Sequence, residues 1–298
     1  MDPRQVVLVT GSSTGFGRLM AQTLARHGYT VFATMRDPAV RNAANARELR
    51  ELAAAESLPL HILEMDVTHE DSVDRVIRAC VAEAGRIDVA INNAGYGVAG
   101  LAEATTLDQV RHLMDTNFLG SVRVNRAVLP HMRKQRSGLL MHISSGAGRV
   151  VIPGFGFYCA SKFALEAMAE AYHYELAQQG IDSCIVEPGA YKTAVFGNIV
   201  TAVDTARTET YGAANRITEK VNGRLAATNA DAQEVADAIL AIVQTAPGER
   251  KLRYRISPQD WGVDAINEVC AQVQERAIAA FDLTEEATFV QRSAASAT

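Results

Sequence analysis

A tyrosine and a lysine stand four residues apart at positions 158 and 162, and Ser145 precedes the tyrosine by thirteen residues. In a helix, positions i and i+4 share a face, so the Tyr158 phenol and the Lys162 ammonium would project side by side. Lowering a tyrosine pKa from about 10 to about 7 needs about 4 kcal/mol. A cation about 4 Å away at an effective dielectric near 20 supplies an energy of that order. The pair is therefore predicted to transfer protons near neutral pH, with Lys162 lowering the pKa of Tyr158.

The start of the chain indicates what such a proton transfer would accompany. An apolar run at 6–9 is followed by a glycine-rich segment at 10–17 and by a helical pattern that ends at Gly28. This order predicts a buried strand, a turn and a helix. The glycines permit a tight turn, close approach to a diphosphate and close helix packing. Their layout is G-x-x-x-G-x-G rather than the common G-x-G-x-x-G, and such a turn could also be a plain connection.

Together, these two segments resemble the short-chain dehydrogenase/reductase family, in its single-domain branch with a T-G-x-x-x-G-x-G turn and a Y-x-x-x-K active site. The resemblance runs from Val6 to about Thr193 and is weaker beyond. Asn117 occupies the place of the family's helical asparagine, and Ser145 that of its active-site serine. Three further motifs follow predicted strands in the family's order: Asp66-Val67, Asn92-Asn93-Ala94-Gly95 and Pro188-Gly189-Ala190-Tyr191-Lys192-Thr193.

The resemblance implies a nicotinamide dinucleotide in a crevice at the carboxyl ends of the strands. The turn would surround the pyrophosphate and adenosine ribose with Gly11, Ser12, Ser13, Thr14, Gly15, Phe16 and Gly17. Asp66 and Val67 would meet the adenine, and the backbone of Asn93, Ala94 and Gly95 would pass the adenosine ribose. The nicotinamide would be bordered by Pro188, Gly189, Tyr191 and Thr193.

The resemblance also implies reversible hydride transfer between the cofactor and a carbonyl or alcohol carbon. Tyr158 would donate its proton to the carbonyl oxygen, and Ser145 would hold that oxygen by a hydrogen bond. Lys162 would lower the pKa of Tyr158, and both side chains would contact the cofactor. Asn117 would hold a water that links the lysine to solvent. Taken singly, each of these residues also has an ordinary structural interpretation on a helix or at a strand end.

The end of the second predicted strand bears on the choice of cofactor. Relatives that use NAD usually carry an aspartate where Met35 stands, and Arg36 is a residue type that pairs with a phosphate. Ser13 could add a hydroxyl donor. We therefore expect NADP(H). In the alternative interpretation, Arg36 is merely solvated and Asp37 serves the ribose, although Asp37 also fits as the cap of the next helix.

Short β-branched runs alternate with longer helical patterns, which predicts an α/β fold with a parallel sheet between two layers of helices. With the resemblance, this is a doubly wound, Rossmann-like fold whose seven strands follow the order 3-2-1-4-5-6-7. The predicted strands are 6–10, 30–34, 60–65, 88–92, 138–144, 181–187 and 252–256. The predicted helices include 39–55 with a cap at Asp37-Pro38, 69–84 with a cap at Thr68, 106–136 and 157–179.

Residues 1–290 are interpreted as one domain, with a disordered tail at 291–298. The segment 194–229 is too long for a plain connection and is expected to form a helical lid over the substrate. The apolar residues of this segment would face the substrate, namely Phe196, Ile199, Val200, Val203 and Tyr211. Residues of neighbouring loops would join them, namely Tyr96, Val98, Ile152 and Phe155. In the alternative interpretation, these residues only pack the lid onto the body. A helical extension at 257–281 would line the pocket or contact another subunit.

Composition excludes several classes of function. The net charge of −5 comes without a basic block, so we expect no nucleic-acid partner. No apolar stretch approaches the roughly 18 residues of a membrane helix, and the strand at residue 6 leaves no room for a signal peptide. Four widely spaced cysteines indicate reduced thiols in the cytoplasm and no metal site. By resemblance, a homodimer or homotetramer would form through the helices 106–136 and 157–179.

Three functions remain open at this stage. The first is an NADP(H)-dependent oxidoreductase acting on a hydrophobic ketone, aldehyde or alcohol. The second is a non-catalytic dinucleotide-binding regulator, although such proteins generally lose the tyrosine or the lysine. The third is a nucleotide-sugar epimerase or dehydratase, which would normally have another glycine spacing. The segments 33–37 and 252–255 are similar to those of hydroxysteroid and retinol dehydrogenases, which does not identify the ligand.

Overall fold

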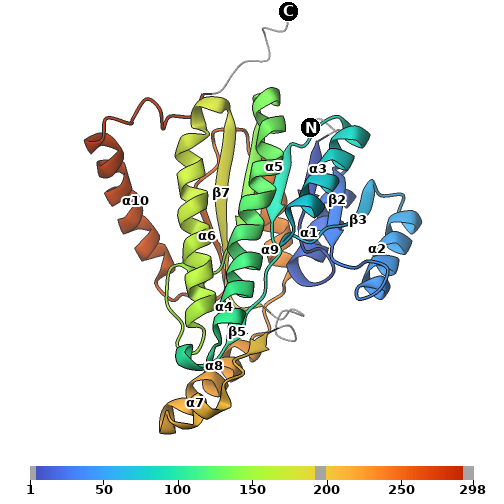
Figure 1. Ribbon diagram of the computed structural model, residues 1–298. Helices are drawn as coiled ribbons and strands as arrows, with labels where there is room; N and C mark the ends of the chain where they lie inside the picture. The colour runs from blue at the N-terminus through green and yellow to red at the C-terminus, as the bar shows by residue number, and fades with distance from the viewer. Residues whose placement is uncertain (1–4, 192–198, 291–298) are drawn as a thin grey trace, which may run out of the picture.

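The computed structural model describes residues 5–191 and 199–290, and Figure 1 shows a parallel sheet between two layers of helices. Within these residues the sheet has seven strands in the order β3-β2-β1-β4-β6-β7-β9. Numbered along the chain within this sheet, that is 3-2-1-4-5-6-7, which confirms the predicted fold. The strands are β1 Val6–Val9, β2 Thr30–Met35, β3 Leu60–Glu64, β4 Val89–Asn92, β6 Gly138–Ile143, β7 Ile181–Pro188 and β9 Arg253–Ile256.

The alternation of side chains along a strand divides the core into two layers. On one face, Val7 and Val9 of β1 pack with α1, α2 and α9, and on the other face Val6 and Leu8 pack with α3, α5 and the end of α6. Because both faces are covered, the strands read as continuous apolar runs. The helices are α1 Gly15–Arg26, α2 Ala43–Ala55, α3 Glu70–Ala84, α5 Gly120–Gln135, α6 Gly156–Glu175 and α9 Gln233–Gln244.

The predicted helix 106–136 forms, but it is interrupted near its middle. Helix α4, Leu107–Met114, passes into the π-helical segment η2, Asp115–Leu119, before α5 begins. Single π turns inside helices occur frequently at functional sites. Asn117 lies in this segment and is buried.

The helix caps predicted at Asp37 and Thr68 are wrong. Helix α2 begins only at Ala43, and Asp37 takes a left-handed φ of 45° in the turn that precedes it. The hydroxyl of Thr68 donates to the Asp66 carboxylate at 2.7 Å instead of capping α3. In both places the path of the chain leaving the strand, which a local pattern does not encode, decides where the helix starts.

A small second sheet was not predicted. Strand β5, Val98–Ala99, pairs in parallel with β8, Val200–Thr201, and so attaches the segment after residue 198 to the loop that follows β4. Two-residue strands are too short to show a periodic pattern. In Figure 1, α7 (Thr205–Glu209) and α8 (Arg216–Ala226) lie below the sheet, and α10 (Val263–Ala280) stands outside α6.

No helix in residues 5–191 or 199–290 is long and apolar enough to cross a membrane. The four cysteines are free thiols.

A buried histidine belongs to β6, which lies between β4 and β7 in the sheet. His142 of β6 is fully buried, its Nδ1 lies 3.3 Å from the Cys184 carbonyl, and its Nε2 lies 3.0 Å from the Asn125 amide nitrogen. Asn125 in turn accepts a hydrogen bond from Asn92 at 2.7 Å. These contacts suit a neutral imidazole, and burial lowers the pKa of His142 to about 4.

We predict that His142 makes the protein less stable in mild acid. Its folded pKa lies below the unfolded value, so the unfolded state binds more protons and stability falls as the pH drops from about 6.5 toward 4. The contribution lost between pH 7 and pH 5 is about 2 kcal/mol. Urea unfolding at both pH values should show a smaller loss for His142→Gln than for the wild type. The exposed His27, changed to Gln, is the control, and an equal loss in all three proteins would contradict the assignment.

Candidate active site

The four predicted catalytic residues meet at the carboxyl end of the sheet. Tyr158, Lys162 and Ser145 line one cavity, which we call the tyrosine cavity. The tyrosine and lysine project from α6, and Ser145 directly follows the end of β6. The Lys162 nitrogen lies 5.8 Å from the centroid of the Tyr158 ring and donates to the carbonyl of Ile143 at 2.8 Å. Asn117 lies behind the cavity wall.

The two adjacent serines have different partners. Ser145 is hydrogen-bonded to the Tyr158 hydroxyl, and its own oxygen accepts from the Ala147 backbone at 3.2 Å. The hydroxyl of Ser144 donates to the Glu166 carboxylate at 2.6 Å. Only Ser145 therefore contacts the phenol, as its spacing from Tyr158 predicted.

The prediction that the pKa of Tyr158 falls to near 7 is wrong. Burial raises the pKa of Tyr158 to about 12, although the hydrogen bond with Ser145 lowers it. Burial also lowers the pKa of Lys162 to about 8, against the charge of Glu166, which raises it. Both groups lose hydration, and the ammonium points to the Ile143 carbonyl rather than to the phenol oxygen. Tyr158 is consequently protonated at neutral pH, which is the form that can donate to a carbonyl oxygen.

Asn117 joins the loop after β4 to helix α6. Its Oδ1 accepts from the Tyr96 backbone nitrogen at 3.0 Å, and its Nδ2 donates to the Tyr96 carbonyl at 3.0 Å and to Ser161 Oγ at 3.1 Å. A Cβ at Gly95 would meet Asn117 Oδ1 at 3.0 Å and Lys162 Nζ at 3.8 Å. The asparagine thus holds the backbone of this loop against the lysine.

A second, larger cleft of about 780 Å³ lies beside the tyrosine cavity, and we call it the glycine-rich cleft. The two share part of their walls, namely Phe16, Asn93, Gly95, Tyr96 and Ile199. Of the residues predicted to hold a cofactor, the glycine-rich cleft is lined by Gly11, Ser13, Thr14, Phe16, Gly17, Arg36, Asp66, Val67, Asn93, Ala94 and Gly95. Pro188, Gly189 and Tyr191 line the tyrosine cavity.

Two residues that were predicted to bind the cofactor line neither space, and a third lies outside the described residues. Ser12 is fully buried, and its hydroxyl donates to the Val9 carbonyl at 3.0 Å. Gly15 supplies a positive φ of 56° at the start of α1 without lining the cleft. Thr193 is outside the described residues.

Glycine is required at two positions of the turn for reasons of space. Gly11 has a φ of +68°, and a Cβ there would lie 2.8 Å from the Ala94 Cα. A Cβ at Gly17 would lie 2.3 Å from the Gly11 carbonyl oxygen. The turn is therefore packed against the loop after β4, and the N-terminus of α1 faces the cleft, as an anion-binding turn requires. These contacts fit a bound diphosphate.

Two arginines from the segment after β2 line the glycine-rich cleft. Arg36 was predicted, whereas Arg41 was not, although a second basic residue five positions later could have indicated it. Asn42 donates to the Arg36 carbonyl at 2.6 Å and so fixes the turn that carries both. Asp37 does not line the cleft, which leaves its predicted alternative role at the ribose without support from the geometry.

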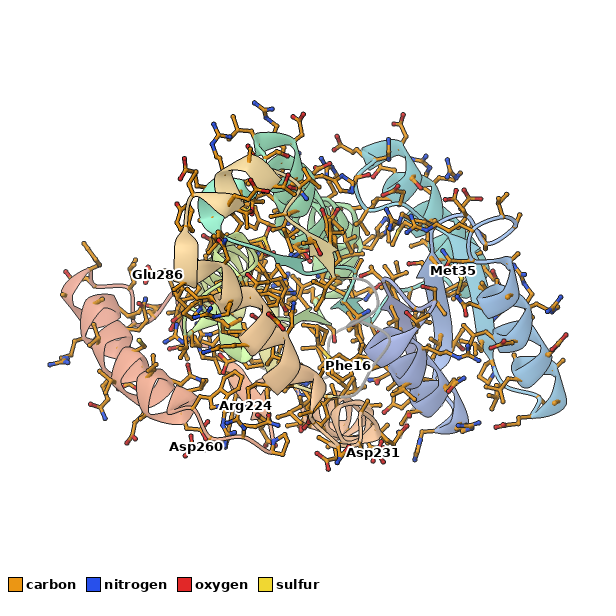
Figure 2. The ribbon with its side chains drawn as sticks, turned by 90° about the horizontal axis from the view of Figure 1, so that it is seen from below. Phe16, Met35, Arg224, Asp231, Asp260 and Glu286 are labelled. Atoms are coloured by element: carbon orange, nitrogen blue, oxygen red, sulfur yellow. The ribbon has the colours of Figure 1, made fainter. Side chains whose placement is uncertain are left out.

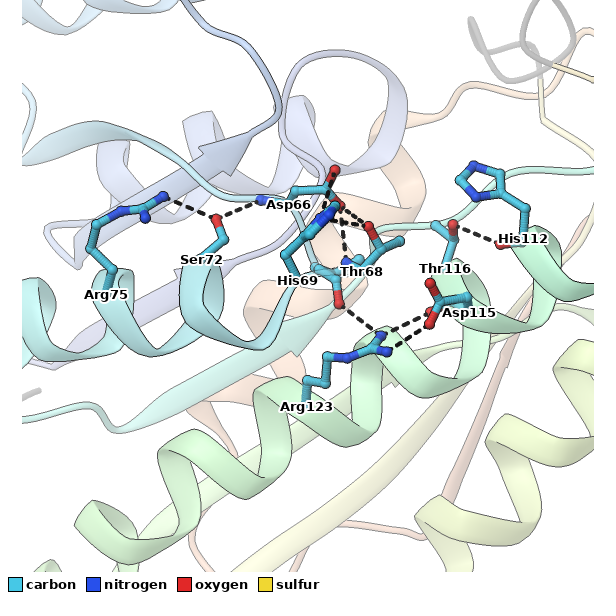
Figure 3. A network of polar contacts seen from close by, with 10 residues as sticks. Asp66, Thr68, His69, Ser72, Arg75, His112, Asp115, Thr116 and Arg123 are labelled. Atoms are coloured by element: carbon cyan, nitrogen blue, oxygen red, sulfur yellow. Dashed lines mark hydrogen bonds and ion pairs between the residues drawn. The ribbon is translucent and has the colours of Figure 1, made fainter.

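Figure 3 shows the polar network below the Asp66-Val67 motif. The Asp66 carboxylate accepts from the Thr68 backbone at 2.9 Å and from the Thr68 hydroxyl, while Arg123 donates to the Val67 carbonyl at 3.2 Å and to Asp115 at 2.7 Å. Burial raises the pKa of Asp66, but the bonds from Thr68 and the charge of Arg36 bring it below its usual value. The network joins the motif to η2 and α5.

The rest of the tyrosine cavity is largely apolar, with a polar side. Tyr96, Ile152 and Phe155 line it as predicted, whereas Val98 lines the glycine-rich cleft. The apolar side is completed by Ile199, Leu225, Trp261 and Val263, and the polar side consists of Glu187, Arg255, Ser257 and Gln259.

The predicted inner side of the segment 199–229 is only partly right. Ile199 lines the tyrosine cavity and Val200 lines the glycine-rich cleft, but Val203 is 62% exposed and Tyr211 is 39% exposed. Leu225 of α8 was missed, and Phe196 is outside the described residues. Figure 2 looks onto this edge, where α8, with its labelled Arg224, lies to one side of Phe16 and Met35 lies to the other.

Within residues 5–191 and 199–290, no three His, Cys, Asp or Glu side chains are grouped so that they could hold a metal ion.

Comparisons with known proteins give a consistent picture. Residues 5–204 match the family described as short chain dehydrogenase. The 3-ketodihydrosphingosine reductase of Bacteroides thetaiotaomicron is 40% identical over 211 residues, which are 71% of this chain and 72% of that protein. The 17-beta-hydroxysteroid dehydrogenase type 1 of Mus musculus is 39% identical over 206 residues, covering 67% of this chain and 58% of that protein.

The solved structures agree with the sequence comparisons. A short-chain dehydrogenase from Streptomyces avermitilis superposes with a TM-score of 0.72 at 31% identity, covering 93% of this chain and 96% of that one. The family match spans the glycine-rich turn, the asparagine, the serine and the tyrosine–lysine pair. The chain therefore belongs to the short-chain dehydrogenase/reductase family.

Proposed function

We propose that the protein is an NADP(H)-dependent oxidoreductase that interconverts a hydrophobic ketone or aldehyde and its alcohol, with Tyr158 as general acid and base. The observation that carries this proposal is the shared wall between two spaces. Tyr158, Lys162 and Ser145 face the tyrosine cavity, and Asn93 and Gly95 separate it from the glycine-rich cleft. A reactive group bound at the junction would lie beside a protonated phenol.

The residues of the glycine-rich cleft would hold the dinucleotide, with Arg36 and Arg41 at its adenosine end and Pro188, Gly189 and Tyr191 at its nicotinamide end. When bound, the nicotinamide supplies or accepts a hydride at the substrate carbon. In the reductive direction, Tyr158 donates its proton to the carbonyl oxygen, which Ser145 holds by a hydrogen bond. The tyrosinate that remains is stabilised by the nearby Lys162 ammonium. Asn117 holds the loop after β4 in place beside Lys162 during this step.

The cavity lining supports a hydrophobic substrate with one reactive oxygen. Apolar residues from the loops and from α8 surround the position beside Tyr158, and Trp261 adds an aromatic surface. The names of two relatives, a 3-ketodihydrosphingosine reductase and a hydroxysteroid dehydrogenase, denote a keto or hydroxyl group on a largely apolar body. We propose the same class of substrate here, with the segment 194–229 acting as its lid.

A homodimer or homotetramer and a cytoplasmic location belong to the same proposal. Leu107 of α4, Leu119 of η2 and Phe163 of α6 are exposed on the helices expected to form the subunit contact. Burying these apolar side chains against a second copy of the chain would stabilise the oligomer.

One test of the proposed function concerns the proton donor. With NADPH and a panel of hydrophobic ketones and aldehydes, Tyr158→Phe should lower turnover by about 10² to 10⁴, because the general acid is lost. Absorbance loss at the nicotinamide band measures turnover, and NADPH affinity measured by fluorescence should change far less than turnover. Tyr172→Phe, on the same helix, is the control. Unchanged turnover in Tyr158→Phe contradicts the assignment, and NADPH binding without turnover of any substrate would favour a regulator instead.

A second prediction concerns cofactor choice. Arg36→Ala should weaken NADPH binding by about tenfold or more while sparing NADH, since a charge-assisted hydrogen bond contributes about 1.5–3 kcal/mol. Arg41→Ala should act in the same direction, and Met35→Asp combined with Arg36→Ala should shift preference to NADH. Fluorescence titrations of both cofactors measure the affinities. Arg47→Ala on α2 is the control, and equal losses for NADPH and NADH would refute phosphate pairing by Arg36.

A further inference from the structure

A buried charged cluster lies on the side of α6 next to the tyrosine cavity. Glu166 and Glu170 of α6 and Glu187 of β7 surround Arg253 of β9. Arg253 contacts Glu187 at 3.0 Å and Glu170 at 2.7 Å, and it also pairs with Glu166. Glu166 is 2% exposed and Glu187 is fully buried. Three carboxylates surround one guanidinium, and two of them, Glu166 and Glu187, are buried where water screens their charge little.

The Glu166 carboxylate is the member of this cluster that is fixed from several sides. The Ser144 hydroxyl donates to its Oε1 at 2.6 Å, and Arg253 binds its other oxygen. A Cβ at Gly148 would lie 2.0 Å from Oε1, so the glycine leaves only enough room for the carboxylate itself. The position of this charge is therefore set by β6, β9 and the turn after β6 together.

This carboxylate lies one helical turn after Lys162 on the same face of α6. Adjacent residues at the end of β6 hold the two groups, since the Ile143 carbonyl accepts from the Lys162 ammonium and Ser144 donates to Glu166. Lys162 is only 6% exposed. A buried ammonium requires a nearby negative charge to remain ionised, and the structure supplies one at a fixed position.

We propose that Glu166 is a positioning residue that keeps the Lys162 ammonium charged in the active site. It touches neither reactant and acts through Lys162. Its importance for turnover rests on the proposed function, whereas the charge relation itself does not.

The directions of the pKa shifts agree with this geometry. Burial lowers the pKa of Lys162, and the charge of Glu166 raises it. Burial and the charge of Glu187 raise the pKa of Glu166 to about 7, against Arg253 and the bond from Ser144. Further ionisable groups near Lys162 and Glu166 are Tyr158 and Glu170 of α6 and Arg255 of β9. Asn267 of α10 donates to the Glu187 carboxylate at 2.7 Å.

The test is a direct titration of Lys162 in the full chain. The sequence contains five lysines, so the ¹³Cε signals of lysine-labelled protein are few, and Lys162→Arg assigns one of them. In Glu166→Gln, the pKa of Lys162 should fall by about one unit or more, because a single charge within about 12 Å contributes at least that much at an effective dielectric near 20. Glu170→Gln is the matched control, because Glu170 also binds Arg253 from α6 but does not contact Ser144, and there the Lys162 pKa should not move.

A second variant covers the case in which Glu166→Gln does not fold. Ser144→Ala removes the bond that favours the Glu166 anion, so the Lys162 pKa should fall in the same direction by a smaller amount. An unchanged Lys162 pKa in the folded variants, or an equal fall in Glu170→Gln, overturns the proposal. The titration uses neither cofactor nor substrate, so its outcome is independent of the proposed activity. Where turnover is found, the alkaline limb of kcat/KM should shift down with the lysine in Glu166→Gln.

Discussion

Helix α6 is held against the end of β6 by three consecutive residues, and the active site depends on this contact. The Ile143 carbonyl binds Lys162, the Ser144 hydroxyl binds Glu166, and Ser145 binds Tyr158. The three partners on α6 are spaced by four residues, so one face of the helix meets one strand end. A shift of the helix by one turn would break all three contacts. The contacts therefore fix the position of α6 relative to the end of β6.

Burial dominates the ionisation of these groups. It raises the pKa of Tyr158 and Glu166 and lowers that of Lys162, so each of the three is pushed toward its neutral form. At Lys162 the charge of Glu166 opposes burial, whereas at Glu166 the charge of Glu187 adds to burial and that of Arg253 opposes it. The site therefore contains an acid, Tyr158, that is protonated at neutral pH, and a cation, Lys162, whose charge depends on a nearby carboxylate.

The two cavities stay adjacent because the loops between them are packed to contact. Gly17 and Gly11 lie against each other and against the loop after β4, and Asn117 ties that loop to α6 through Tyr96 and Ser161. The Asp66-Val67 motif is joined to η2 by Arg123. The π-helical turn thus connects the Asp66-Val67 wall of the cleft to the loop after β4, which both spaces share.

The amino-acid sequence was enough to predict the strands, the grouping of Tyr158, Lys162 and Ser145 and, through the family resemblance, the strand order. The strands and the Tyr158–Lys162 pair follow from apolar runs and helical spacing, which are local, whereas the strand order and the place of Ser145 follow from the family resemblance. Where the helices after Asp37 and Thr68 begin depends on the tertiary structure, and so the caps predicted there are wrong. The tertiary structure also places Arg41 at the wall of the cleft and leaves Val203 exposed. It also decided the pKa of Tyr158 and the meeting of Glu166 with Arg253, 87 residues apart. Burial and long-range contact follow from how β7 pairs with β9 and how α6 packs, and no local pattern contains that information.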